Sequence, residues 1–260
     1  MKMIDGFDIH SHFNHNSPYD VPSGYGGIPD GINRRDLGWI QEQYDKLGIL
    51  GGGFSTYASV FEHTECIEEE NEYLHALAEE QDWIWQWVVI DPRQPVTFRQ
   101  ADKMLASPRC LGIKIHPSYH GYDIEDYADA LFSFAAEHRS VLLMHPQKTE
   151  QMPLWADKYP EMKLIIAHLG STAHVEAIRT ARHGNIYTDT SGGASSLNYV
   201  VEYAVKTVGA EKILFGTDDY SCAFQYGRVA LSCLSDEDKQ MILLKNALRL
   251  FPNLRKSIKA

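Results

Sequence analysis

Two histidines near the start of the chain have the spacing of a metal-binding pair. His10 and His12 are separated by one residue, within the alternation of polar and apolar residues over 6–13. Residues two apart in a strand share a face, so the alternation predicts that Asp8, His10 and His12 point the same way. Two imidazoles about 6.5–7 Å apart along a strand can bind one ion such as Zn²⁺. The pair alone is a weak signal, because two surface histidines on an edge strand give the same pattern.

Further polar residues of the same kinds follow apolar segments later in the chain. They are His116 after 110–115, with Lys114 two residues before it, then His145 after 141–144, His168 after 163–167 and Asp218 after 212–217. Alternation predicts that Leu143 shares the face of His145, and that Leu164 and Ile166 share the face of His168. A polar residue at one strand end is ordinary where a strand meets solvent. Several strands that each end in an inward-facing His or Asp instead predict a common site.

The elements that must position these residues alternate regularly between strand and helix. The predicted strands cover 6–13, 49–54, 84–91, 110–117, 141–146, 163–170, 185–189 and 212–219, and the predicted helices cover 34–46, 62–81, 97–106, 123–137, 152–159, 174–182, 197–208 and 235–251. Fully apolar strand segments are typical of a parallel sheet that is buried on both faces. The pattern predicts an α/β protein, a single (β/α)8 TIM-type barrel domain over residues 1–260.

An open doubly wound sheet is the structural alternative, but it would normally have a glycine-rich turn after its first strand. Here that strand ends in histidines. The glycines at 51–53 lack the Lys-Ser/Thr of a phosphate-binding loop, so they indicate close packing. Since all strand ends of a barrel open onto one face, where active sites lie, the barrel would bring His10, His145 and Asp218 together.

Composition excludes several classes of function. The chain has 260 residues with 44% hydrophobic residues, enough for a large core, and a net charge of −11, which argues against a nucleic-acid surface. No apolar run is long enough to span a membrane, and no signal peptide is visible. The four cysteines show no C-x-x-C pairing, which favours a reducing, cytoplasmic location. The oligomeric state stays open, a homo-oligomer included.

The histidine pattern, with Asp218 after the eighth strand, resembles the amidohydrolase superfamily. The short layout resembles the amidohydrolase-2 branch of hydrolases, lactonases and metal-dependent decarboxylases similar to aminocarboxymuconate-semialdehyde decarboxylase. Residues 112–117, 215–218 and the segment starting at Asn246 also resemble that branch. Only nine residues precede His10, so the additional β-sandwich domain of larger members is expected to be absent.

The resemblance implies that His10, His12, His145 and Asp218 bind a divalent ion, most simply one Zn²⁺, with Mn²⁺ or Fe²⁺ as alternatives. It implies that His168 faces the substrate or completes a second metal site. Asp218 would also act as general base and His168 would orient or protonate the substrate. Lys114 is either a carbamylated bridge between two ions or, as we favour, an ammonium that holds an anionic substrate. His116 contacts substrate or has an ordinary strand-end role.

The leading functional hypothesis is hydrolysis of a small ester, lactone or amide by a metal-activated water. Its alternative is non-oxidative decarboxylation of a small unsaturated or aromatic acid, and a further one is a metal-binding barrel without turnover. Secondary expectations concern residues near the strand ends. Asp8 either orients a ligand imidazole or makes a structural hydrogen bond, Asp219 is a rival ligand, His15 and His120 line the pocket, and the 14–33 loop is a lid that carries Tyr19 and Tyr25. The acidic helix 62–81 is expected to be a solvated outer face.

Overall fold

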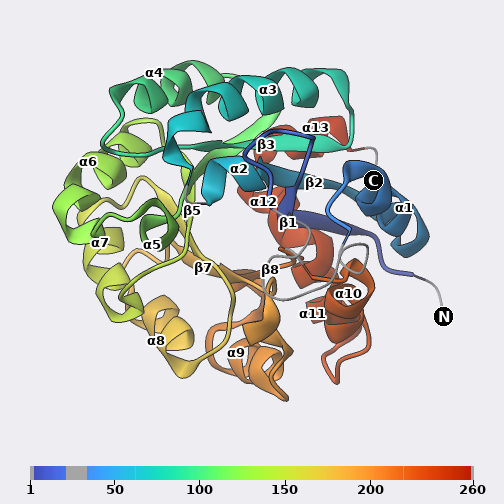
Figure 1. Cartoon of the computed structure of the whole chain (residues 1–260). Helices are drawn as coiled ribbons and strands as arrows, with labels where there is room; N and C mark the ends of the chain where they lie inside the picture. Colours follow the sequence, from blue (N-terminus) through green and yellow to red (C-terminus); the bar gives the residue numbers. More distant parts are fainter. Residues whose placement is uncertain (1–2, 22–33, 62, 219, 259–260) are drawn as a thin grey trace.

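The computed structural model describes residues 3–21, 34–61, 63–218 and 220–258. In this part of the chain, eight parallel strands form one sheet in sequence order, β1 to β8, with helices outside it (Figure 1). The strands are β1 (Gly6–Phe13), β2 (Ile49–Thr56), β3 (Ile84–Val89), β4 (Cys110–Ile115), β5 (Val141–Met144), β6 (Lys163–Ile166), β7 (Ile186–Asp189) and β8 (Ile213–Leu214). The predicted TIM-type (β/α)8 barrel is confirmed.

The helices of the structure include a counterpart of every predicted helix, with ends that differ by up to five residues. They are α1 (Leu37–Leu47), α2 (Tyr57–Val60), α3 (Ile67–Glu80), α4 (Pro95–Met104), α5 (Pro117–His120), α6 (Ile124–Glu137), α7 (Met152–Lys158), α8 (Thr172–Thr180), α9 (Val200–Val208), α10 (Cys222–Ala230), α11 (Asp236–Gln240), α12 (Asn246–Leu250) and α13 (Pro252–Ser257). The sequence analysis missed α2, α5, α10 and α13. Three of these are one or two turns long, too short to show an amphipathic period.

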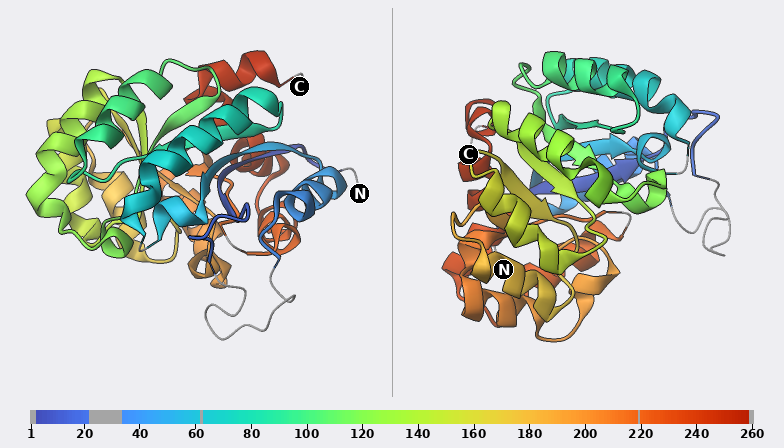
Figure 2. Two further views of the ribbon diagram at one scale, coloured as in Figure 1. Left: turned by 45° about the horizontal axis from the view of Figure 1, so that its top comes forward. Right: turned by 90° about the vertical axis from the view of Figure 1, so that its left-hand side faces the viewer.

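The core has two layers, one inside the barrel and one between the sheet and the helices. Leu143 and Ile165 belong to the inner layer, together with Phe7 of β1 and Trp87 of β3. At one end of the barrel, α12 and α13, in red in Figure 2, cover this layer, and the ring of Phe251 packs edge-on against Trp87. The opposite end, where the C-terminal ends of the strands lie, is therefore the open end of the barrel.

The predicted inward face of β6 is wrong. Leu164 and Ile166 pack in the outer layer with Ile178 of α8, whereas Ile165 lies inside the barrel. His168 nevertheless reaches the barrel mouth, because it lies beyond the strand and adopts a left-handed backbone with φ +63°. That conformation breaks the alternation on which the prediction depended.

The alternation predicted for β1 is also wrong in part. Its pairing with β2 shifts register between Gly6 and Asp8 and again between Asp8 and Ser11. Such bulges re-aim side chains. The Asp8 carboxylate therefore accepts a hydrogen bond from Tyr44 of α1, outside the barrel, while His10 and His12 face the mouth.

Hydrogen bonds between β1 and the segment after β8 close the barrel. The backbone N–H of Ile9 donates to Phe215, and those of Thr217 and Asp218 both donate to the carbonyl of His10. Thr217 also donates from its N–H and its hydroxyl to Asp8, across 209 positions of sequence. β8 has only two residues, so these bonds are a large part of what joins the first strand to the last.

Candidate metal centre

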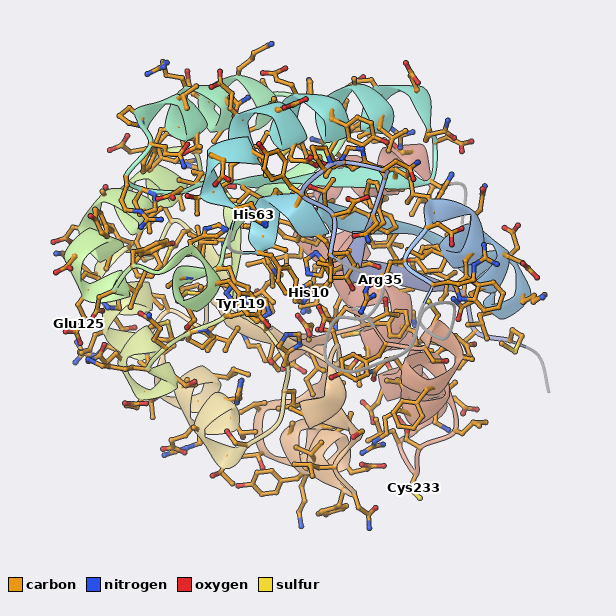
Figure 3. The ribbon with its side chains drawn as sticks, viewed as in Figure 1. His10, Arg35, His63, Tyr119, Glu125 and Cys233 are labelled. Atoms are coloured by element: carbon orange, nitrogen blue, oxygen red, sulfur yellow. The ribbon has the colours of Figure 1, made fainter. Side chains whose placement is uncertain are left out.

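Histidines and one aspartate from four strand ends meet at the open mouth of the barrel. Their ligand atoms form two groups in which all atoms lie within 4.8 Å of one another: His10 with His145 and His168, and His10 with His12 and Asp218. His10 lies near the centre of the barrel when it is viewed as in Figure 3. All the predicted ligands are thus brought together, and His10 belongs to both groups.

His10 is held by residues at the end of β7. Its Nδ1 lies 3.0 Å from Oδ2 of Asp189 and 3.0 Å from the hydroxyl of Ser191. Burial lowers the pKa of His10 to about 4, so the ring is neutral at pH 7. A neutral imidazole carries one N–H proton, and here it lies on Nδ1, which donates a hydrogen bond to the carboxylate of Asp189. The lone pair is left on Nε2, which faces the other ligands.

His12 is oriented in the same manner by β2. Its Nδ1–H donates to the backbone carbonyl of Ser55 at 3.1 Å, and its Nε2 lies 3.4 Å from Oδ1 of Asp218. Burial is the main reason that the pKa of His12 lies well below its usual range. His12 therefore also presents a free lone pair to the centre, as a metal ligand must.

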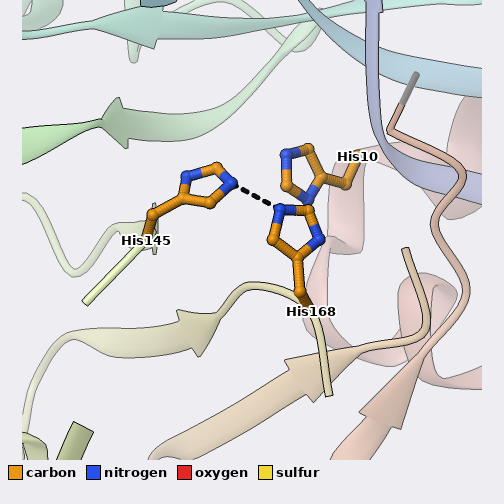
Figure 4. Close-up of side chains that lie close together, drawn as sticks. All are labelled: His10, His145 and His168. Carbon is orange, nitrogen blue, oxygen red and sulfur yellow. Dashed lines mark hydrogen bonds between the residues drawn. The ribbon is translucent and has the colours of Figure 1, made fainter. Parts of the chain in front are cut away.

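His145 and His168 face one another from β5 and β6. Figure 4 shows the two rings beside His10, and their Nε2 atoms are 2.6 Å apart. Burial lowers the pKa of His145 well below its usual range. Two imidazole nitrogens this close must share a proton or an ion, because two facing lone pairs repel. The buried Nδ1 of His145 has no hydrogen-bond partner among the described residues.

Gly192 gives the ring of His168 the space it occupies. A Cβ atom at this position would lie 2.5 Å from Nδ1 of His168, and φ is +72°, which L-amino acids rarely adopt. Ser191, one residue earlier, places its hydroxyl 2.9 Å from the same Nδ1. The turn after β7 thus fixes His168 from one side.

Asp218 occupies the gap between the two groups of ligands. Its carboxylate lies 3.4 Å from Nε2 of His12 and 3.9 Å from Nε2 of both His10 and His168. The side chain is 19% exposed, so it is in contact with both the ligand nitrogens and solvent. Like His168, it has a left-handed backbone, with φ +59°. Backbone strain of this kind is concentrated at functional sites.

Lys114 is a buried cation at the centre of the site. Its side chain is fully buried, and Nζ lies 2.6 Å from Nε2 of His10. Burial lowers the pKa of Lys114 to about 7, against the opposing charges of Asp218 and Asp189. The ammonium or amine therefore lies within reach of anything bound between the histidines.

His116 forms part of an aromatic wall beside the ligands. Its ring stacks on His145 with centroids 4.0 Å apart, and its Nδ1 accepts a hydrogen bond from the backbone N–H of Tyr119. The ring of Tyr119 in turn stacks on Phe61 at 4.5 Å, and Phe61 lies beside Tyr57. His116 therefore contacts His145, one of the ligand candidates.

The other residues predicted near the site have partners of their own. His15 bonds Glu70 of α3 at 2.7 Å and stacks on Tyr73, and His120 lies 3.0 Å from the carbonyl of Ser59. Neither imidazole is hydrogen-bonded to His10, His12, His145 or Asp218, whereas the backbone N–H of His120 donates to the carbonyl of His116. Tyr19 lies against His63, with ring centroids 5.3 Å apart. Asp219 and Tyr25 lie outside the described residues.

Asp8 has the structural role of the two that the sequence allowed. It accepts hydrogen bonds from the N–H of His10, the hydroxyl of Tyr44 and two donors of Thr217. It contacts no ligand imidazole. The imidazole of His10 is oriented by Asp189 instead, which the sequence analysis named only as the end of a strand. Asp189 could have been found, because it too is an acidic residue at a strand's C-terminal end.

The donor set fits a divalent metal ion. Four imidazoles and one carboxylate converge, and the Nδ1–H groups of His10 and His12 are held by Asp189 and by the carbonyl of Ser55. Hydrogen bonds of this kind orient ligand histidines in metal sites. The centre is at the C-terminal mouth of an eight-stranded parallel barrel, the place where enzymes of this fold have their active sites.

A fold and centre of this kind define a class of metal-binding barrel enzymes. The sequence matches the family model for amidohydrolases over residues 7–252. The chain therefore belongs to the amidohydrolase family, as the histidine pattern predicted, and is an enzyme of the amidohydrolase superfamily. A search of curated proteins by sequence gives no match. No helix in the described ranges combines the length and apolar character that crossing a membrane requires.

Several solved structures have the same fold. One is a dihydroxybenzoic acid decarboxylase from Polaromonas with bound manganese and the inhibitor 2-nitroresorcinol (TM-score 0.78, 17% identity, 99% of this chain and 100% of that chain). Another is 5-carboxyvanillate decarboxylase from Sphingomonas paucimobilis (0.72, 14%, 96% and 99%). A third is a probable 2-pyrone-4,6-dicarboxylic acid hydrolase from Acinetobacter baumannii with citric acid bound (0.68, 12%, 95% and 99%). At these identities the likeness is one of fold.

Proposed function

We propose that this protein is a metal-dependent hydrolase of a small ester, lactone or amide that carries a carboxylate. The observation that carries the proposal is the position of Asp218, which is in contact with His12 and with solvent at once. A divalent ion held by the histidines would lower the pKa of a bound water and polarise a carbonyl. Asp218 would accept the proton of such a water, and Lys114 would attract the anionic group of the substrate.

One ion is favoured over two because both groups of ligands include His10. His10 has a single free lone pair, on Nε2, so it cannot serve two centres independently. Zn²⁺ suits the mixed imidazole and carboxylate donors. Mn²⁺ is the first alternative, since the similar decarboxylase from Polaromonas has bound manganese. Lys114 is proposed to act as a cation here and not as a carbamylated bridge.

Decarboxylation of an aromatic acid is a second candidate, and the aromatic wall favours it. His116, Tyr119 and Phe61 form a continuous stack beside His145, a surface that suits a flat ring. Two of the similar folds are decarboxylases of aromatic acids. The same residues would hold the ion in both reactions, so only the products distinguish them.

The test combines elemental analysis with product analysis. We expect purified protein to contain about one divalent ion per chain, and His12→Ala and Asp218→Asn each to reduce metal affinity and activity by about 100-fold or more. His183→Ala and Asp82→Asn, at exposed positions, are matched controls. Release of CO₂ would select decarboxylation, and a hydrolysed acid would select hydrolysis. If both site variants keep wild-type metal content and turnover, the proposed function is wrong.

A further inference from the structure

Ser191 contacts three groups of the centre at once. Its hydroxyl lies 2.9 Å from Nδ1 of His168 and 3.0 Å from Nδ1 of His10, and it donates a hydrogen bond to Oδ1 of Asp189. The side chain is completely buried. A serine hydroxyl has one proton to donate and two lone pairs that accept. The proton and both lone pairs of Ser191 take part in hydrogen bonds here.

The numbers of protons and lone pairs determine which atom donates in each of the three hydrogen bonds. Oδ1 of Asp189 also accepts hydrogen bonds from the backbone N–H groups of His168 and Ser191, so this oxygen carries no proton and can only accept. The Ser191 proton must therefore go to Asp189. The oxygen of Ser191 can then only accept from the two imidazoles, so His10 and His168 both carry their proton on Nδ1.

We propose that Ser191, supported by Asp189, is a positioning residue that fixes His10 and His168 in the same Nδ1–H tautomer. Both Nε2 atoms then carry a lone pair directed at the mouth of the barrel. His168 accordingly enters the chemistry as a ligand or a proton acceptor. It does not begin the reaction as the proton donor that the sequence analysis allowed.

The tautomers of His10 and His168 do not depend on a bound metal or substrate. The catalytic role that they would have rests on the proposed function, which this inference deepens. Gly192 supports it independently, since any Cβ atom there would meet Nδ1 of His168 and displace the ring from Ser191. The backbone N–H groups of His168 and Ser191 also donate to Oδ1 of Asp189. They fix the carboxylate that orients the Ser191 proton.

The experiment is imidazole ¹⁵N NMR on the metal-free protein near pH 8, where neutral histidines show their tautomer directly. We expect the Nδ1–H form at His10 and His168 in the wild type. Ser191→Ala should convert His168 largely to the commoner Nε2–H form and weaken Zn²⁺ binding, measured by calorimetry, about 10- to 100-fold.

The matched control is Ser195→Ala. Ser195 is equally buried in the same turn, but its hydroxyl donates to the carbonyls of Thr190 and Gly192 and touches no histidine. We expect it to leave the tautomer of His168 unchanged. An Nε2–H form of His168 in the wild type overturns the proposal without any variant. An unchanged tautomer in a folded Ser191→Ala protein also overturns it. If the tautomers are as expected but no turnover is found, only the proposed function fails.

Discussion

Nδ1 of His10 lies 3.0 Å from Oδ2 of Asp189, a residue 179 positions away in the sequence. In Asp189→Asn, the amide oxygen would stay with the backbone N–H groups of His168 and Ser191, and the amide NH₂ would face His10. His10 would then have to accept on Nδ1 and carry its proton on Nε2, where the ion would bind. We expect Zn²⁺ affinity to fall about 10- to 100-fold with the fold unchanged. Calorimetric titration checks this, with Asp82→Asn as the surface control. A Kd within twofold of the wild type would contradict it.

The pair formed by His15 and Glu70 predicts a pH-dependent contribution to stability. Burial lowers the pKa of His15, but the interaction with Glu70 outweighs burial, so the pKa of His15 is raised overall. Burial raises the pKa of Glu70, but hydrogen bonds from His15 and other residues outweigh burial, so the pKa of Glu70 is lowered overall. The His15 contribution is present below its usual pKa of 6.5 and is lost as pH rises through the raised value. The Glu70 contribution is present above 4.5 and is lost as pH falls through the lowered value.

Glu70→Gln should therefore reduce the free energy of unfolding most between about pH 4.5 and 6.5, by about 1–3 kcal/mol. The loss should shrink on either side of that range. Urea unfolding from pH 3.5 to 9 measures it. Glu69→Gln, one residue earlier and exposed, is the matched control and should change little. An equal loss at pH 6 and pH 9 would show that the ion pair with His15 is not the cause.

The burial of Lys114 at the site is predicted to destabilise the folded protein. Its pKa of about 7 lies below the usual 10.5, so the folded protein resists the charged form, and stability rises with pH between these two values. Lys114→Met should stabilise the metal-free protein by about 1–4 kcal/mol at pH 6 and much less near pH 10. Urea unfolding with a chelator present checks this. Lower stability of the variant at pH 6 would mean that the lysine has a stabilising partner when charged.

Gly53 is predicted to be required for packing in the barrel. A Cβ atom there would lie 2.4 Å from Cδ1 of Leu111 and 2.8 Å from Nε1 of Trp87. Gly53→Ala should lower the free energy of unfolding by about 1–3 kcal/mol. Gly38→Ala is the control, because Gly38 lies in α1 with nothing nearer than 3.4 Å, and it should be neutral or stabilising by up to about 1 kcal/mol. Equal effects at both sites would refute the packing explanation.

Much of the centre could be predicted because the C-terminal ends of all strands in a parallel barrel lie at the same face. Each strand ends at the same face, so His145 and Asp218, which are far apart in sequence, had to lie near His10 once the barrel was inferred. The glycines of β2 were correctly attributed to close packing. These predictions needed only the strand ends and the fold.

The rest depended on backbone geometry that alternation does not contain. The register shifts in β1 turned Asp8 towards Tyr44. Because His168 has a left-handed backbone, its side chain faces the barrel mouth although Ile166, two residues earlier, faces the helices. The acidic residues of the helix 62–81 were expected to form a solvated outer face, and Glu68 and Glu69 are exposed, but Glu70 is buried against His15 from another segment. Ser191 has no distinguishing neighbours in the sequence, and only the turn after β7 shows what it touches.

The seam between β1 and β8 determines when during synthesis the centre can exist. Thr217 and Asp8 meet across 209 positions, so the ring of strands stays incomplete until the chain has been synthesised past residue 217. Contacts of such long range are the most costly in chain entropy and are expected to form late. A nascent chain that stops before residue 217 would contain every histidine of the centre and still lack the carboxylate of Asp218. Translation through the eighth strand is thus what turns a partly folded scaffold into a potential catalyst.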